Sequence, residues 1–261
     1  MGRRRLLTLA VATALSSLGG TLATAGTVNI NPSKDNTLYQ YDPADGDKSN
    51  ALGMHFFAGL TAMKELRRGV LAFDIAGNIP PGSTITAVSL SANMSRAPSN
   101  TAYVVELHKL LADWGEGTSI APGEEGDGAP ATPNDPTWRH RFFDTIFWTT
   151  QGGDFSATVS ASKMVGGVGQ YTWSSTQMAA DVQGWLDNPA SNFGWLMLGD
   201  EVDILTAKRF DTRESTNPPV LAVTYTPSGS PTPTATPTAT PAPTVRPTPM
   251  PRPRPTPIPR P

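Results

Sequence analysis

The stretch that decides the fold reads RRGVLAFDI at residues 67–75, PPGS at residues 80–83 and TITAVSLSANM at residues 84–94. In the first and third of these segments, apolar residues alternate with small or polar ones. This period of two is typical of half-buried strands. The Pro-Pro-Gly sequence between them disfavours a continuous helix. We therefore predict two strands at the centre of an antiparallel sheet.

The same alternation recurs further along the chain. Strands are predicted at residues 103–111, 193–198, 208–215 and 218–226, with glycine, proline and other turn residues around them. A chain of about 200 residues is long enough to form one all-β domain with its own core. The sequence predicts an antiparallel jelly-roll β-sandwich over residues 26–226.

One stretch changes from strand to helix spacing. Met178, Val182 and Trp185 would lie on one face of a helix, and Ser174 with Gln177 resembles a capping box at its start. An Asn-Pro pair follows and ends the helical pattern. We predict one short helix that covers the sandwich.

Residues 1–25 have the pattern of a secretory signal peptide. Three arginines precede an apolar stretch at residues 6–18, and Ala23-Thr24-Ala25 supplies the small residues of a cleavage site. The apolar stretch is shorter than the roughly 20 residues that span a bilayer. We expect cleavage after Ala25, secretion of the remaining chain and no insertion into the membrane after cleavage.

Residues 227–261 consist mainly of proline and threonine, with four arginines toward the end. Such a composition cannot bury a core, so it predicts a disordered, extended tail of polyproline type. An inert spacer is favoured over a specific binding role.

The composition excludes several classes of site. The chain has no cysteine, which excludes disulfides and thiolate metal sites. Residues 26–226 contain 13 basic and 22 acidic residues, a net charge of −9. A domain this acidic is expected to bind nucleic acid or an anionic membrane poorly.

Three carboxylates in the loop at residues 41–47 raise the question of a metal ion. Asp42, Asp45 and Asp47 could hold calcium, but their spacing departs from the EF-hand pattern and no distant glutamate completes it. A solvated loop is favoured. No cofactor is predicted, and a structural calcium ion is the alternative.

Asp113 and Glu116 are the carboxylate pair that glycoside hydrolysis would require. Their position in a glycine-containing turn favours a role as hydrogen-bond acceptors for the turn. The chain also lacks a nucleophile elbow, a zincin helix, a phosphate loop and a dinucleotide fingerprint. We therefore predict a non-enzymatic protein, with a polysaccharide lyase or hydrolase as an alternative.

Residues 120–169 lose the strand periodicity, and loops of this length in compact domains are usually functional or disordered. The part at residues 122–128 is predicted to be mobile, whereas residues 138–148 are rich in aromatic rings. Packing is expected to account for Phe142, Phe143 and Phe147. The residues predicted to contact a carbohydrate are Trp138, Arg139, His140, Arg141 and Trp148.

An ordered set of segments resembles the DNRLRE domain. The set comprises Asp35-Asn36-Thr37-Leu38-Tyr39-Gln40, the strand at residues 67–75, the segment at residues 82–90, Asp113-Trp114-Gly115-Glu116-Gly117, the helix at residues 182–185, and Arg213-Glu214. The matches cover about residues 30–226. Gln40 stands where the family has glutamate, and residues 120–169 are longer than the family pattern.

The DNRLRE domain is similar to carbohydrate-binding module family 96 and to disaggregatase-related domains. The resemblance implies a secreted jelly-roll module that accompanies polysaccharide-active enzymes, with alginate the ligand of some relatives. The net charge of −9 argues against such a polyanion unless Arg139 and Arg141 form a local basic patch. The predicted function is binding of extracellular or cell-wall polysaccharide without catalysis. A structural or adhesive cell-surface protein is the other alternative.

The signal-peptide pattern gives the first testable prediction. Because the small residues of the cleavage site end at Ala25, we expect the mature protein to begin at Gly26. N-terminal sequencing of protein from the culture medium checks this. A cytosolic protein that begins at Met1 contradicts it.

Overall fold

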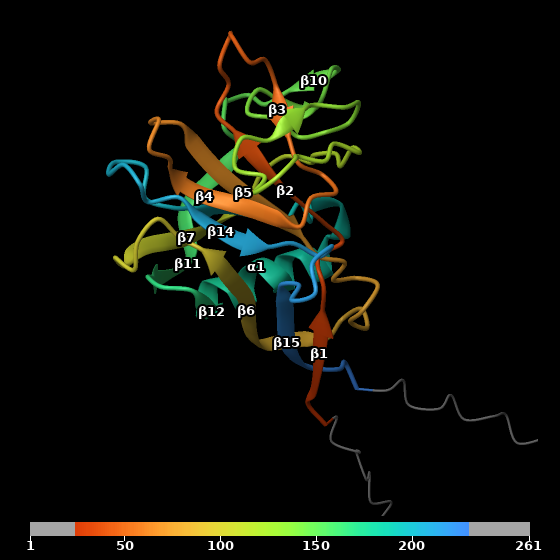
Figure 1. Cartoon of the computed structure of the whole chain (residues 1–261). Helices are drawn as coiled ribbons and strands as arrows, with labels where there is room; N and C mark the ends of the chain where they lie inside the picture. The colour runs from red at the N-terminus through yellow and green to blue at the C-terminus, as the bar shows by residue number, and fades with distance from the viewer. Residues whose placement is uncertain (1–23, 230–261) are drawn as a thin grey trace, which may run out of the picture. The chain divides into compact units, whose positions relative to one another are not determined.

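A computed structural model of the chain describes residues 24–229. Almost all of the predicted signal peptide and most of the Pro/Thr-rich tail lie outside these residues. The described residues form an antiparallel β-sandwich with one α-helix, which confirms the all-β prediction (Figure 1). None of the helices in this part of the chain is long and apolar enough to cross a membrane.

The first layer of the sandwich is built around the long strand β6 (Thr84–Arg96), which pairs with β12, β14 and β15. The edge strand β1 pairs with β15, and β4 pairs with β14. The bounds of these strands are β1 Gly26–Ile30, β4 His55–Leu60, β12 Gly169–Ser174, β14 Lys208–Asp211 and β15 Val220–Thr226.

The second layer is built around β5 (Leu66–Ala72), which pairs with β2 on one side and β13 on the other. Beyond β13 lie β7 and then β11, the last strand of the sheet path. A short hairpin contact between β4 and β5 connects the two layers at one corner. The bounds of the remaining strands are β2 Lys34–Tyr39, β7 Tyr103–Leu110, β11 Phe155–Val165 and β13 Trp195–Leu198.

The two strands predicted from the opening stretch both form, but they do not pair with each other. After β5 the chain crosses to the other layer through residues 73–83 and continues as β6. Leu71 on β5 and Leu90 on β6 belong to the same buried core cluster. Both are interior strands with antiparallel partners, but they lie in opposite layers because Leu71 and Leu90 face one core from opposite sides.

The predicted helix forms as α1 (Thr176–Asp187), and a 3₁₀ turn, η1 (Pro189–Ser191), follows it. Its N-cap is Ser175, whose side chain accepts a hydrogen bond from the Met178 backbone N–H, so the predicted cap at Ser174 is wrong by one residue. The helix buries Met178, Val182 and Trp185 in the main core, as its spacing predicts. It therefore closes one end of that core.

A second, smaller core lies on the other face of the second layer. Val70 and Leu196 contribute apolar side chains from the strands. Trp138 and Trp148 cover them from residues 120–154, the long connection between β7 and β11 that we call the excursion. Residues 120–154 carry three short strands, β8 Ala129–Pro130, β9 His140–Phe142 and β10 Ile146–Phe147. Strand β3 (Lys48–Ser49) pairs with β8. This part lies at the end of the domain away from β1 and β15 (Figure 1).

A substitution at Phe73 tests the packing of the main core. Its side chain is buried and packs edge to face against Trp195, with ring centroids 6.1 Å apart. We expect Phe73→Ala to lower the free energy of unfolding by about 3–5 kcal/mol, because the substitution leaves a cavity in a close-packed interior.

Chemical denaturation measures the loss, with Val202→Ala as the control. Val202 is 85 % exposed, so its truncation should change stability by less than about 0.5 kcal/mol. Equal effects of the two substitutions would contradict the assignment of Phe73 to the core.

Candidate functional site

The two predicted stacking residues, Trp138 and Trp148, are buried in the second core, with 7 % and 4 % of their surface exposed. The indole N–H of Trp148 donates to the Thr137 carbonyl at 2.9 Å. The prediction that these rings offer open faces to a sugar is wrong. The outer face of the second layer is apolar, and the indoles serve as its cover.

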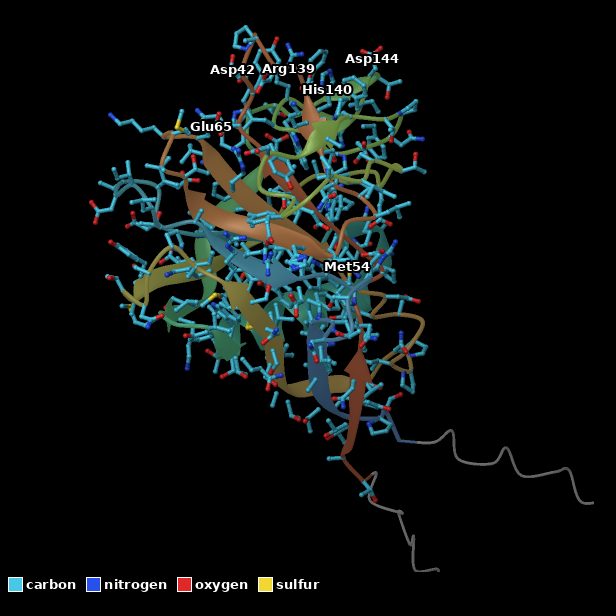
Figure 2. The ribbon with its side chains drawn as sticks, in the orientation of Figure 1. Asp42, Met54, Glu65, Arg139, His140 and Asp144 are labelled. Atoms are coloured by element: carbon cyan, nitrogen blue, oxygen red, sulfur yellow. The ribbon has the colours of Figure 1, made fainter. Side chains whose placement is uncertain are left out.

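Arg139 and His140 hold the loop of residues 41–47 in place. Arg139 donates two hydrogen bonds to the Asp47 carboxylate, and its guanidinium lies 3.8 Å from the centre of the Tyr41 ring. The buried His140 contacts the same carboxylate, with Nδ1 3.4 Å from Oδ1. Figure 2 shows Arg139 and His140 at the same end of the domain as Asp42. These polar groups are engaged with the protein rather than turned to a ligand.

Arg141 is half-buried and donates to the Asp113 carbonyl at 3.1 Å. The hairpin that carries it exposes 62 % of Phe147, which we predicted to pack. Both residues of β10, Ile146 and Phe147, are exposed, whereas Trp148, which follows the strand, is buried. The structure therefore brings the five predicted site residues into one region but gives them mainly structural contacts.

The predicted carboxylate sites are also engaged within the protein. Asp47 faces Arg139, and Asp113 pairs with Lys34 at 3.0 Å. Both oxygens of Glu116 accept hydrogen bonds, from the Asp35 backbone N–H and from Arg213. Across residues 24–229, no group of three or more histidine, cysteine, aspartate and glutamate side chains is arranged to hold a metal ion.

Three of the segments that resemble the DNRLRE domain meet in one cluster. Arg213 donates to Glu116 at 2.6 Å and to Glu214 at 2.7 Å, and its backbone N–H donates to Asp35 at 2.9 Å. Glu116 in turn accepts from the Asp35 backbone at 3.0 Å. The cluster joins the start of β2, the turn after β7 and the segment after β14. These contacts hold the three segments together, and we call the cluster of Asp35, Glu116, Arg213 and Glu214 the clasp.

Asp35 is the deepest member of this clasp. The residue is fully buried, and its Oδ1 atom has no hydrogen-bond partner among the described residues. Burial raises the pKa of Asp35 to about 8, helped by the nearby carboxylates of Glu214 and Glu116 and opposed by the hydrogen bond from the Arg213 backbone. The side chain is therefore largely protonated near neutral pH.

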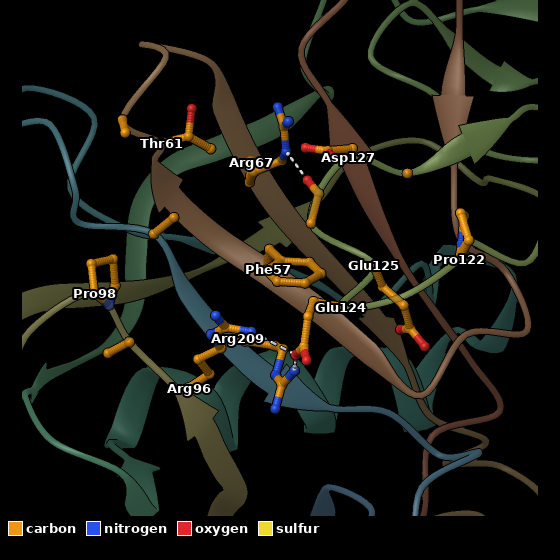
Figure 3. Close-up of a pocket in the computed structure, with 15 residues that line it drawn as sticks. Phe57, Thr61, Arg67, Arg96, Pro98, Pro122, Glu124, Glu125, Asp127 and Arg209 are labelled. Atoms are coloured by element: carbon orange, nitrogen blue, oxygen red, sulfur yellow. Dashed lines mark hydrogen bonds and ion pairs between the residues drawn. The ribbon is translucent and has the colours of Figure 1, made fainter.

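A groove of about 480 Å³ lies elsewhere on the domain and contains none of the predicted site residues. It runs beside β4 and β14, between the end of β6 and residues 122–128 (Figure 3). Phe57 and Ala207 contribute to its apolar lining, with Pro98 and Pro122 at opposite sides. This size lies within the usual range for ligand pockets, about 300–1,000 Å³.

Charged side chains surround this apolar lining. Arg96 and Arg209 supply donors, while Glu124 and Asp127 supply acceptors. Because donors and acceptors both border an apolar surface, the groove can hold a ligand that has both apolar and hydroxyl faces.

Residues 122–128, which form one wall of the groove, are anchored to the sandwich. The Glu125 carboxylate accepts from the backbone N–H groups of Met54 and His55 and from the Asn50 amide, at 2.8–3.1 Å. The Gly126 carbonyl accepts from Arg67 at 3.1 Å. The loop predicted to be mobile is therefore held by several hydrogen bonds at its centre.

Sequence reasoning missed this groove because its residues come from four separated segments. The strand residues Phe57, Arg96 and Arg209 carry no motif, and the acidic loop resembles an ordinary solvated turn. The one available signal was the cluster of Glu124, Glu125 and Asp127 between glycines inside the long excursion.

The chain matches no protein-family model, and no curated protein matches it.

The clasp around Asp35 gives a pH-dependent prediction. Between about pH 4 and pH 8 the folded state holds a proton on Asp35 that the unfolded chain has lost, since the ordinary pKa is 3.8. The contribution of this group to stability therefore falls as the pH rises through this range and is constant above it. Asp35→Asn removes the titration but keeps an oxygen acceptor for the Arg213 N–H.

We expect the stability of Asp35→Asn relative to the wild type to increase from about pH 5 to about pH 9. Urea unfolding of both proteins at several pH values measures the difference. A difference that does not change with pH would contradict the raised pKa of Asp35.

Proposed function

We propose that the protein is a secreted, non-catalytic module that binds extracellular or cell-wall polysaccharide, and that the groove beside β4 and β14 is its binding site. The observation that carries this proposal is the combination of an apolar lining with a charged rim in a groove of about 480 Å³. A sugar ring presents apolar C–H patches bordered by hydroxyl groups. It therefore needs both kinds of partner in one site.

The rigidity of the groove supports this role. Two of its walls belong to strands of the sandwich, and the third is held by the hydrogen bonds of Glu125. A preformed site avoids the entropic cost of ordering a loop when the ligand binds. This feature suits a module whose only task is binding.

The resemblance to the DNRLRE domain supports the same class of function. The residues that carry it most clearly, Asp35, Glu116 and Arg213, contact one another in the clasp. Their contacts are consistent with a motif that maintains the domain while the binding surface lies elsewhere. Glu116 is engaged by Arg213 and by the Asp35 backbone N–H, and Asp113 pairs with Lys34 through Oδ1.

A blocking substitution tests the groove. Ala62 is exposed and lines it, so Ala62→Trp should fill part of the space that a glycan would occupy. We expect this variant to lose about tenfold or more in affinity for the best polysaccharide found on a glycan array, as measured by isothermal titration.

Met63→Trp is the matched control. Met63 is the next residue, is 81 % exposed and does not line the groove. This variant should bind as the wild type does, and both variants should unfold at the same temperature. Loss of binding in both, or in neither, would place the glycan outside the groove.

A further inference from the structure

Two arginines on the rim of the groove converge on one oxygen atom of Glu124. Arg96 Nη1 lies 2.7 Å from Glu124 Oε2, and Arg209 Nη1 lies 2.5 Å from the same atom (Figure 3). Arg96 ends β6, Arg209 belongs to β14, and Glu124 comes from the loop opposite them. A single carboxylate thus occupies a site made by two strands.

Arg209 is held more firmly than Glu124, whereas the Arg96 side chain is 59 % exposed. The Arg209 side chain is only 15 % exposed, and its Nε donates to Ser95 Oγ at 3.1 Å. The Glu124 side chain is 68 % exposed and has no ion-pair partner other than these arginines among the described residues. Arg209 therefore stays in position if Glu124 turns away.

Movement of Glu124 would not require movement of its loop. The neighbouring Glu125 carries the hydrogen bonds that fix residues 122–128. Exposed ion pairs contribute little to stability, because both partners are well solvated when apart. A ligand can therefore replace the Glu124 carboxylate at small cost.

We propose that Arg96 and Arg209 form an anion site in the groove, that Glu124 occupies this site in the free protein, and that an acidic substituent of a glycan displaces it. This inference rests on the proposed function and names the chemistry that the groove would select. The substituent is a carboxylate or a sulfate half-ester, since either anion matches the planar donors of arginine.

The surrounding charges favour a glycan with isolated acidic groups rather than a densely charged polyanion. Glu125 and Asp127 also line the groove, and residues 26–226 have a net charge of −9. A chain with a charge on every sugar would meet these carboxylates and be repelled. One anionic group placed against the arginine pair would not.

The hydrogen bonds from Arg96 and then Arg209 hold the pKa of Glu124 below its usual value, so the side chain stays ionised at neutral pH. Glu124→Gln keeps the shape of the side chain and removes its charge. Asp187→Asn is the matched control, because it removes an exposed carboxylate from α1, outside the groove.

The test is titration of the ¹⁵N-labelled protein with methyl glucuronide, glucose 6-sulfate and uncharged methyl glucoside, with the Arg209 Nε–H resonance as readout. We expect the two anions to shift this resonance and to bind Glu124→Gln about two- to tenfold more tightly than the wild type or Asp187→Asn. Methyl glucoside should cause no comparable shift. A response to only one anion would identify the preferred group and support the site.

The double variant Glu124→Gln/Arg96→Gln should lose the gain, since one of the two donors is absent. Equal responses of the wild type and Glu124→Gln, or no shift of Arg209 with either anion, would overturn the proposal. Failure of the proposed function has a different signature. The array would then show no bound polysaccharide, while the anions would still bind Glu124→Gln more tightly.

Discussion

Strand β5 is buried on both faces, and the rest of the domain depends on this constraint. Leu71 points into the main core, whereas Val70 and Ala72 point into the second core. A sheet that is apolar on both faces needs a cover on each. The first layer and α1 provide one cover, and the long excursion provides the other.

The second cover explains why Trp138 and Trp148 are unsuited to stacking on a sugar. Burying the indoles of Trp138 and Trp148 removes apolar surface from water on both sides of the contact. Arg68 fits the same arrangement, since its guanidinium lies 4.8 Å from the centre of the Trp138 ring and donates to Glu201. The binding site that we propose therefore lies on another surface, in the groove beside β4 and β14.

Carboxylates fix the irregular parts of the chain to the sheets. Glu125 accepts two backbone N–H groups of the β4 region, Glu116 accepts that of Asp35, and Asp35 accepts that of Arg213. Each bond joins segments far apart in the sequence. A charge-assisted bond such as those to Glu125 is stronger than a neutral one, and a buried N–H without an acceptor would be costly. Much of the acidic character of the domain thus serves its own architecture.

The sequence by itself determined the fold class, because local periodicity reports which side of each strand or helix meets a core. It identified β5, β6, β7, β13, β14 and β15 and the buried face of α1. It did not identify β11, whose run of serine and alanine residues carries little apolar contrast at the edge of the sheet. The segments of Asp35, Glu116 and Arg213, three of the six that carry the resemblance to the DNRLRE domain, meet in the clasp.

Only the tertiary structure decided which strands pair, which aromatic rings are covered and where a ligand can bind. The placement of β5 and β6 in opposite layers, the burial of Trp138 and Trp148 against the second layer, and the convergence of Arg96 and Arg209 on Glu124 all depend on contacts between distant segments. Hydrophobic patterning is a property of neighbours along the chain. The groove depends on packing between four segments, so a local pattern could point to one of its walls but not to the groove itself.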